Sequence, residues 1–476
     1  MHGARVRIER ISIDNLKNVR HGELVLSNPR RPNGPSILGL YGQNGSGKTV
    51  LIDAIGILEQ CLTGGSVDSS EALEVSVGAE SATLEFEFSV KRNDPSIAYR
   101  AVYRLSIKGE KGIDAAVQGA SGTTRIFDER ISLAWNGPNG KMRLSTMMDT
   151  ARGGVFGPVA KLQALTGAME DDLDLAVEKR LAYRESRSFL FSSALRNAIA
   201  SNVPNEIARS AGVEKSLAET VLWIVDALHN YGVFELFVAK SHDVGMVALN
   251  ALPFPFRVTT QQARVTGKAT IPMNGTMALS DEVFEVVKSA IENMDTVLRQ
   301  IIPGLAVKVV DLGPEITADG RRGRRMQLVS EREGRTIPFE LESDGIKRMV
   351  SLLHLLILMY NDPSVTVAID ELDSGVFEYL LGELVGIVAE RGKGQLVFTS
   401  HNLRPLETID RGYIAFTTTN PSNRYVRMAH VKATNNLRDF YYRDIVLGGQ
   451  QEMLYEPTNN SEIALAFLEA GTNDVA

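Results

Sequence analysis

The stretch that decides the fold is a glycine-rich loop that reads Gly42-Gln43-Asn44-Gly45-Ser46-Gly47-Lys48-Thr49. A short apolar run at residues 37–41 precedes it, and a helix-like segment at residues 50–58 follows it. This order of strand, loop and helix is the context in which such a pattern binds phosphate. The glycines let backbone N–H groups curl around phosphate oxygens, and the helix N-terminus adds partial positive charge. The sequence therefore predicts an α/β fold whose loop binds a nucleoside triphosphate.

Two side chains of this loop have separate expected roles. Lys48 is placed to reach the β- and γ-phosphates, and the Thr49 hydroxyl is placed to hold Mg²⁺. The other six residues of the loop are expected to surround the phosphates. ATP and Mg²⁺ are therefore the expected ligands.

Composition narrows the class of protein. A length of 476 residues suggests two or three domains, and 44% hydrophobic with 23% charged residues is ordinary for a soluble protein. The net charge of −7 does not indicate nucleic-acid binding, although a local basic patch is compatible with it. A single cysteine, Cys61, excludes a disulfide framework and a thiolate zinc cluster. The N-terminus lacks a signal-peptide pattern, and the longest apolar stretch, near residues 350–360, is too short for a bilayer span. A cytoplasmic protein without membrane contact is expected.

The distribution of strand-like and helix-like patterns suggests four segments. Residues 1–155 read as a β-rich lobe that contains the loop, and residues 156–280 as a mainly helical insertion. Residues 281–430 read as a second lobe, which begins with an amphipathic helix at 280–302 capped by Ser280. Residues 431–476 form a C-terminal extension.

Two later strands end in polar residues suited to phosphate chemistry. The apolar run at residues 365–369 ends in Asp370 and Glu371, at the edge where α/β folds place ligands. Asp370 is expected beside Mg²⁺, and Glu371 is expected to polarise the attacking water. A second strand at residues 394–400 ends in His401, which is expected to sense the γ-phosphate or to hold the water.

A second anion site is predicted between the loop and the acidic strand. Ser343-Asp344-Gly345 opens a long apolar helix, so free N–H groups and the Ser343 hydroxyl gather at a helix N-terminus. One nucleotide does not need two phosphate cradles from the same chain. The economical interpretation is that this cradle completes a nucleotide site on another copy. A simple helix-capping turn is the alternative.

In this order, the motifs at 42–49, 343–345, 370–375 and His401 resemble those of ABC-type ATPase heads. The nearest group is the prokaryotic AAA-15/AAA-21 class, which is related to RecF, the SMC heads and the OLD-family ATPases. The resemblance implies a P-loop NTPase with an ABC-type head, built from a β-rich N-terminal lobe and a parallel-sheet core. It also implies that Ser343 and Gly345 form a signature motif acting across a head-to-head dimer, and that Asp373 lies in the D-loop. Leu-Glu-Ser-Asp-Gly at 341–345 departs from the transporter signature, and Gln118 lacks the context of a Q-loop residue.

The spacing of the motifs adds an expectation about partners. More than half of the sequence separates Lys48 from Asp370 and shows no sustained heptads, so a compact insertion is expected rather than a coiled coil. The short sequence after His401 contains no acidic cluster resembling a Toprim nuclease centre. An associated nuclease or toxin would then be a separate polypeptide, as in two-gene anti-phage systems.

Three hypotheses about function remain open. The first is ATP hydrolysis by a head-to-head homodimer, or a higher homo-oligomer, that controls such an effector in antiviral defence. The second is an ATP-locked scaffold that sequesters the effector with little turnover. The third is a RecF-like DNA maintenance ATPase, for which Arg321, Arg322, Arg324 and Arg325 would contact a phosphate backbone; a solvated hairpin tip is the alternative for these arginines.

Overall fold

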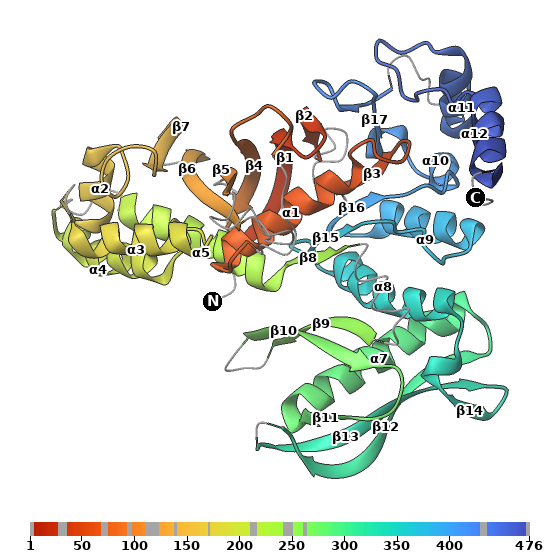
Figure 1. Cartoon of the computed structure of the whole chain (residues 1–476). Helices are drawn as coiled ribbons and strands as arrows, with labels where there is room; N and C mark the ends of the chain where they lie inside the picture. The colour runs from red at the N-terminus through yellow and green to blue at the C-terminus, as the bar shows by residue number, and fades with distance from the viewer. Residues whose placement is uncertain are drawn as a thin grey trace.

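The computed structural model describes residues 4–26, 36–67, 75–92, 98–110, 123–137, 140–169, 172–209, 217–240, 251–259, 264–318, 320–428 and 436–472. Within these ranges the chain forms a central sheet with an arm of strands and helices on one side and a further α/β lobe below it (Figure 1). No helix in the described ranges is long and apolar enough to cross a membrane.

The central sheet has the strand order β18-β17-β3-β16-β15-β8. Its members are β3 (Ser36–Tyr41), β8 (Leu236–Ala239), β15 (Thr366–Ile369), β16 (Gln395–Thr399), β17 (Ile414–Thr417) and β18 (Tyr425–Val426). The pairs from β8 to β17 are parallel, and only β18 is antiparallel. All residues of β3, β15, β16 and β17 are buried, which explains their continuous apolar sequences.

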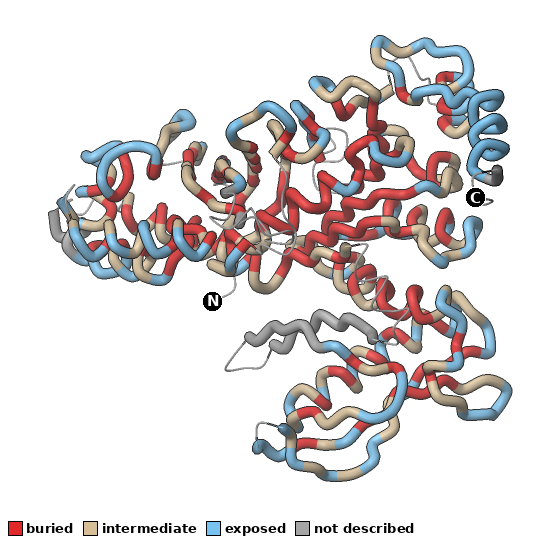
Figure 2. The backbone as a smooth tube through the Cα atoms, in the orientation of Figure 1, coloured by how far each residue is buried: buried red, intermediate tan, exposed pale blue. Residues whose placement is uncertain are grey.

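The central sheet separates two apolar cores, because successive side chains of a strand point to opposite faces. Leu38 and Leu40 of β3 join the core that contains α1 (Lys48–Thr63) and the N-terminal strands. Ile37 and Tyr41 join the core that contains α8 (Asp344–Asn361), α9 (Glu378–Arg391), α10 (Pro405–Thr408) and α11 (Leu437–Leu447). Both faces of the sheet are thus covered, as Figure 2 shows by the buried strands at its centre.

The N-terminal arm contains an antiparallel sheet of order β2-β1-β4-β5-β6-β7. Its strands are β1 (Arg5–Leu16), β2 (Val19–Val25), β4 (Ala82–Lys91), β5 (Ala98–Glu110), β6 (Thr123–Gly137) and β7 (Gly140–Asp149). The helices α2 (Val159–Thr166), α3 (Leu173–Arg184), α4 (Ser193–Arg209) and α5 (Leu217–Phe234) follow. The strict alternation of buried and half-buried residues along β4 shows that one face of this sheet packs inward.

The third lobe is built around one amphipathic helix. α7 (Asp281–Ile301) confirms the predicted helix at 280–302, and the Ser280 hydroxyl accepts a hydrogen bond from Val283 N, as expected for its N-cap. The helix packs on a sheet of order β11-β13-β12, with β14 beside β13. The strands of this sheet are β11 (Met277–Ser280), β12 (Leu305–Ile316), β13 (Arg322–Arg332) and β14 (Arg335–Pro338). β9 (Ala251–Thr259) and β10 (Arg264–Pro272) form a separate two-stranded antiparallel sheet.

Residues 156–280 are less uniform than the predicted helical insertion. The helices α2 to α5 lie between residues 159 and 234, but β8 at 236–239 forms the edge of the central sheet beside β15, and β9 to β11 are strands. The sequence pattern could not reveal β8, because Leu-Phe-Val-Ala is too short an apolar run to show a periodicity. Its hydrogen-bonding partner, β15, lies much later in the chain. The division into domains by residue number remains a prediction.

Candidate nucleotide-binding site

The loop at 42–49 adopts a conformation that depends on glycine at two positions. Gly47 has a φ of +91° directly before α1. At Gly42, a Cβ atom would lie 1.7 Å from Thr417 Oγ1, so only glycine allows β17 to approach the loop this closely. Lys48 curls back over the loop, and its Nζ donates 2.8 Å hydrogen bonds to the carbonyls of Gly42 and Gln43. The curl leaves the ammonium at the centre of the loop.

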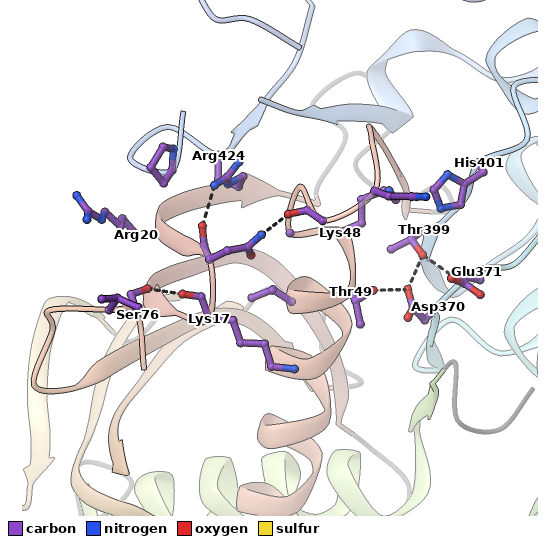
Figure 3. Close-up of a pocket in the computed structure, with 17 residues that line it drawn as sticks. Lys17, Arg20, Lys48, Thr49, Ser76, Asp370, Glu371, Thr399, His401 and Arg424 are labelled. Atoms are coloured by element: carbon purple, nitrogen blue, oxygen red, sulfur yellow. Dashed lines mark hydrogen bonds between the residues drawn. The ribbon is translucent and has the colours of Figure 1, made fainter. Parts of the chain in front are cut away.

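A cavity of about 860 Å³ opens above this loop. Figure 3 shows its lining residues, which come from the β1–β2 turn, the loop, the ends of β15 and β16, and the segment around β18. The lining side chains most relevant to phosphate chemistry are Lys48, Thr49, Asp370, Glu371, Thr399 and His401. The structure therefore brings together the loop, the two acids and the histidine that the sequence predicted, although more than half of the sequence separates Lys48 from Asp370.

The carboxylate of Asp370 is the most enclosed acid of the site. It is fully buried at the end of β15, and its Oδ1 accepts a 2.6 Å hydrogen bond from Thr399 Oγ1. Thr49 Oγ1 lies 3.4 Å from the same Oδ1. A hydroxyl and a carboxylate at this separation are the oxygen donors that Mg²⁺ prefers, so Thr49 and Asp370 fit the ion in the predicted way.

Thr399 is a site residue that the sequence did not reveal. Its hydroxyl donates to Asp370 Oδ1 and accepts a 2.8 Å hydrogen bond from Glu371 N. One hydroxyl thus fixes both predicted acids. A polar residue at the inward end of a buried strand, two positions before His401, is the signal that could have identified it.

Burial of the Lys48 side chain lowers its pKa, while the nearby carboxylates Asp370, Glu371 and Asp373 act in the opposite direction. The ammonium is thus withdrawn from water and faces acids only at a distance. Phosphate oxygens would supply the close negative partner that this lysine lacks within the loop.

Glu371 and His401 both lie on the cavity wall. Glu371 has a φ of +49°, a left-handed conformation that is uncommon for this residue type and that turns the chain sharply after β15. The backbone N–H groups of His401 and Asn402 donate to the Asp373 carboxylate at 3.1 and 3.0 Å. Asp373 is therefore a positioning residue for the histidine, while the His401 ring remains exposed toward the cavity (Figure 3).

Ser343 and Gly345 do not line the cavity formed by the described part of their own chain. They lie at the start of α8, where the Ser343 side chain makes no capping hydrogen bond to that helix. A Cβ at Gly345 would lie 2.4 Å from the carbonyl oxygen of Gly375, so the start of α8 packs directly on the segment 372–375, where a D-loop is expected. Arg348, further along α8, contacts the end of β15, because its Nη2 lies 3.5 Å from the carbonyl oxygen of Asp370.

The β1–β2 turn forms a wall of the cavity that the sequence did not predict. Lys17, Asn18 and Arg20 line the cavity, and the Asn18 amide donates to the carbonyl of Gly45. Arg424 Nη2 donates in turn to Asn18 O at 2.8 Å, and Tyr425 Oη donates to Gly47 O at 2.9 Å. The turn, the loop and β18 therefore hold one another in place.

Two of the four clustered arginines are paired with acids of the same hairpin. Arg324 lies 2.8 Å from Asp311, and Arg325 lies 2.5 Å from Glu315. These pairs favour the solvated-hairpin interpretation over a DNA-binding patch. Gln118, the weak Q-loop candidate, lies outside the described residues.

A comparison with protein families finds that residues 10–172 match the family model described as an AAA domain. This match includes the loop at 42–49 and supports ATP binding. No curated protein matches the chain.

Solved structures similar to this chain include SMC heads and RecF. The Smc head domain with a coiled coil and joint from Pyrococcus yayanosii has 12% identity and a TM-score of 0.40, covering 92% of this chain and all of the other. The SMC head domain from Thermotoga maritima has 14% identity and a TM-score of 0.34, covering 89% and 99% of the two chains. The recombination mediator protein RecF bound to ATPrS has 14% identity and a TM-score of 0.33, covering 86% and 97%.

The loop, the parallel sheet that carries it and the AAA match agree with one another. Residues 10–172 thus match an AAA domain model, and the described residues form a mixed α/β fold in which a largely parallel sheet carries the phosphate-binding loop.

Proposed function

We propose that the protein hydrolyses ATP in composite sites formed by two copies arranged head to head. One observation carries this proposal: the cavity gathers Lys48, Thr49, Asp370, Glu371 and His401, whereas Ser343 and Gly345 of the same chain lie outside it. The anion cradle at 343–345 does not face the nucleotide cavity of its own chain, so it is suited to a nucleotide bound by the loop of a second copy. A two-fold arrangement would complete the sites of both copies in the same way.

The residues of the cavity divide the chemistry among them. Lys48 and the N–H groups of the loop bind the phosphates and stabilise the charge that moves during transfer. Thr49 and Asp370 hold Mg²⁺, which, when bound, neutralises phosphate charge. Glu371 orients the attacking water and accepts its proton.

The remaining residues place these groups. Thr399 holds the carboxylate of Asp370 and the backbone of Glu371 through one hydroxyl. His401 contacts the γ-phosphate. The Asp373 carboxylate positions this histidine by accepting a hydrogen bond from its backbone N–H. Ser343 and Gly345 of the second copy close the site over the same phosphate.

The output of this cycle is proposed to be conformational control of a separately encoded effector, a nuclease or a toxin, in prokaryotic antiviral defence. The support is architectural: the arm at 159–234 and the lobe at 264–341 both extend away from the central sheet and offer surfaces that the ATP site does not use (Figure 1). An ATP-locked scaffold would use the same surfaces with slow turnover. The ratio of effector release to phosphate release separates the two.

The direct test is the variant Glu371→Gln. It removes the proton acceptor but leaves the loop intact, so ATP binding is expected to persist while phosphate release falls by at least 100-fold. Fluorescent-nucleotide titration and a phosphate-release assay on purified protein measure the two quantities. The matched control Lys48→Ala is expected to lose both. Turnover at the wild-type rate in the Glu371→Gln variant would refute the assignment.

A further inference from the structure

The last helix of the chain, α12 (Asn460–Thr472), is apolar and exposed along its length. Every residue from 460 to 470 is exposed, and Figure 2 draws the helix in pale blue at the edge of the molecule. Phe467 is 77% exposed and Leu468 is 69% exposed. Since a helix of 13 residues is only marginally stable by itself in water, this helix requires a surface to pack on.

The segment before α12 is fixed to the phosphate-binding loop. Glu456 N donates a 2.8 Å hydrogen bond to Gln43 Oε1, on the second residue of the loop. Leu454 is buried in the apolar core of the central sheet, and Thr419 N donates to Met453 O at 2.8 Å. α12 begins four residues after Glu456, so its start lies within about 14 Å of that contact. The helix therefore emerges beside the phosphate-binding loop.

A second set of exposed apolar side chains flanks the signature and the D-loop. Leu341, two residues before Ser343, is 67% exposed, and Phe377, two residues after Gly375, is 74% exposed. Tyr379, at the start of α9, is 55% exposed. Large apolar side chains exposed beside a predicted contact surface are typical of interfaces.

We propose that α12 of one copy packs on Leu341 and Phe377 of the second copy and clamps the composite ATP site. This rests on the proposed head-to-head arrangement, which brings the signature and D-loop of one copy to the loop of the other. That arrangement would bring Leu341 and Phe377 toward the loop beside which the other copy's α12 emerges. Two-fold symmetry repeats the contact, so each copy gives one helix and receives one.

The sequence of α12 argues against a membrane as its occupant. A helix that lies on an anionic membrane surface presents Lys or Arg beside its apolar face. Residues 460–472 contain neither, and their charged side chains are Glu462 and Glu469. The link between Gln43 and Glu456 further ties the helix to the nucleotide loop, which a second copy approaches.

The test uses thiol cross-linking of the full-length chain. The native Cys61 is fully buried, so an introduced cysteine is the reactive thiol. Phe467→Cys and Phe377→Cys are each introduced into the Glu371→Gln background, with an affinity tag on one of them, and the two proteins are mixed with a flexible bismaleimide. The result expected is a cross-linked species containing both proteins, at least ten times more abundant with ATP and Mg²⁺ than without them. Val177→Cys, at an exposed position of α3, replaces Phe467→Cys in the control and is expected to give none.

The other outcomes overturn the proposal in distinguishable ways. Efficient cross-linking between two copies of the Phe467→Cys variant would show instead that the α12 helices of the two copies pack on each other. An ATP-dependent dimer seen by light scattering without the mixed cross-link would overturn the clamp and leave the composite sites in place. Absence of any ATP-dependent dimer would overturn both. As a second measurement, Phe467→Glu combined with Leu468→Glu is expected to weaken the ATP-dependent dimer at least tenfold.

Discussion

At the scale of single residues, the proposed site needs groups that would contact the reacting phosphate and groups that hold the first set in position. Asp370 and Glu371 are adjacent in sequence and both line the cavity, but Asp370 is fully buried and Glu371 is partly exposed. The Thr399 hydroxyl contacts both, through a side-chain oxygen of one and the backbone of the other. The positions of the two acids therefore share one anchor, the Thr399 hydroxyl.

Replacing Thr399 with valine tests this coupling. The substitution keeps the shape of the side chain and removes the hydroxyl, and a hydrogen bond to a charged group contributes about 1.5–3 kcal/mol. We expect kcat for ATP hydrolysis to fall about 10- to 100-fold with little change in ATP affinity. Steady-state phosphate release and nucleotide titration measure the two effects. Thr399→Ser retains the hydroxyl and should restore most activity, and an unchanged kcat in the valine variant would contradict the role.

At the scale of elements, a buried carboxylate fastens the helical arm to the N-terminal sheet. Glu129 of β6 accepts hydrogen bonds from Tyr103 Oη at 2.6 Å, from Phe189 N at 2.7 Å and from the Ser188 hydroxyl. Burial raises the pKa of Glu129, and the hydrogen bonds from Ser188 and Tyr103 oppose that rise. Because the folded chain binds this proton more tightly than the unfolded chain, the carboxyl stabilises the fold most below pH 4.5, and this contribution declines as the pH rises through the raised pKa.

Removing this carboxyl should destabilise the arm. Glu129→Ala leaves three buried donors without their acceptor, so the free energy of unfolding at pH 7 should fall by about 3 kcal/mol. The loss should be larger at pH 5 than at pH 7, in keeping with the raised pKa. Urea denaturation at the two pH values measures both. Glu23→Ala removes an exposed partner of Arg10 and should cost less than about 1 kcal/mol. A loss of unfolding free energy that is larger at pH 7 than at pH 5 would contradict a raised pKa of Glu129.

Elements with strong local signals were predictable from the sequence, and elements defined by distant partners were not. The loop, the amphipathic helix α7 and the acidic strand β15 each have a pattern that identifies them within about 20 residues. β8 is a very short strand, and its place in the sheet is set by β15. Asn18 and Glu456 contact the phosphate-binding loop through tertiary hydrogen bonds, Asn18 with Gly45 and Glu456 with Gln43. No local sequence pattern encodes these two contacts.

At the scale of the whole molecule, the proposed dimer would divide the ATP site of each copy into two half-sites that face different neighbours. The proposed loop half lies around the cavity, and the proposed signature half lies at the start of α8, where Gly345 packs on Gly375. Asp373, two residues before Gly375, accepts a hydrogen bond from the backbone of His401, so the proposed half-sites of one copy would be linked through residues 373–375. ATP bound in one composite site is thereby expected to influence the other.

A mixing experiment tests the composite site. Lys48→Ala disables the loop half and Ser343→Arg disables the signature half, so each variant should be inactive alone. In a mixed dimer, the intact loop of one copy meets the intact signature of the other, and random pairing gives one such site in about a quarter of all sites. We expect phosphate release to recover to about that fraction of the wild-type rate. Mixing Lys48→Ala with Glu371→Gln, both damaged in the same half, should restore nothing. Recovery in neither mixture would refute the shared site.

The strand order of the central sheet has a consequence for synthesis of the chain. Neighbouring strands come from residues 36–41, 236–239, 366–369, 395–399 and 414–417, so the sheet closes only after most of the polypeptide has left the ribosome. Pairings between such distant segments make folding slow and leave the early strands without neighbours during translation. The nascent N-terminal part, although it contains the complete phosphate loop, therefore lacks Asp370, Thr399 and Thr417. A ribosome-bound chain should acquire nucleotide affinity late and abruptly, which would prevent unfinished copies from pairing with finished ones.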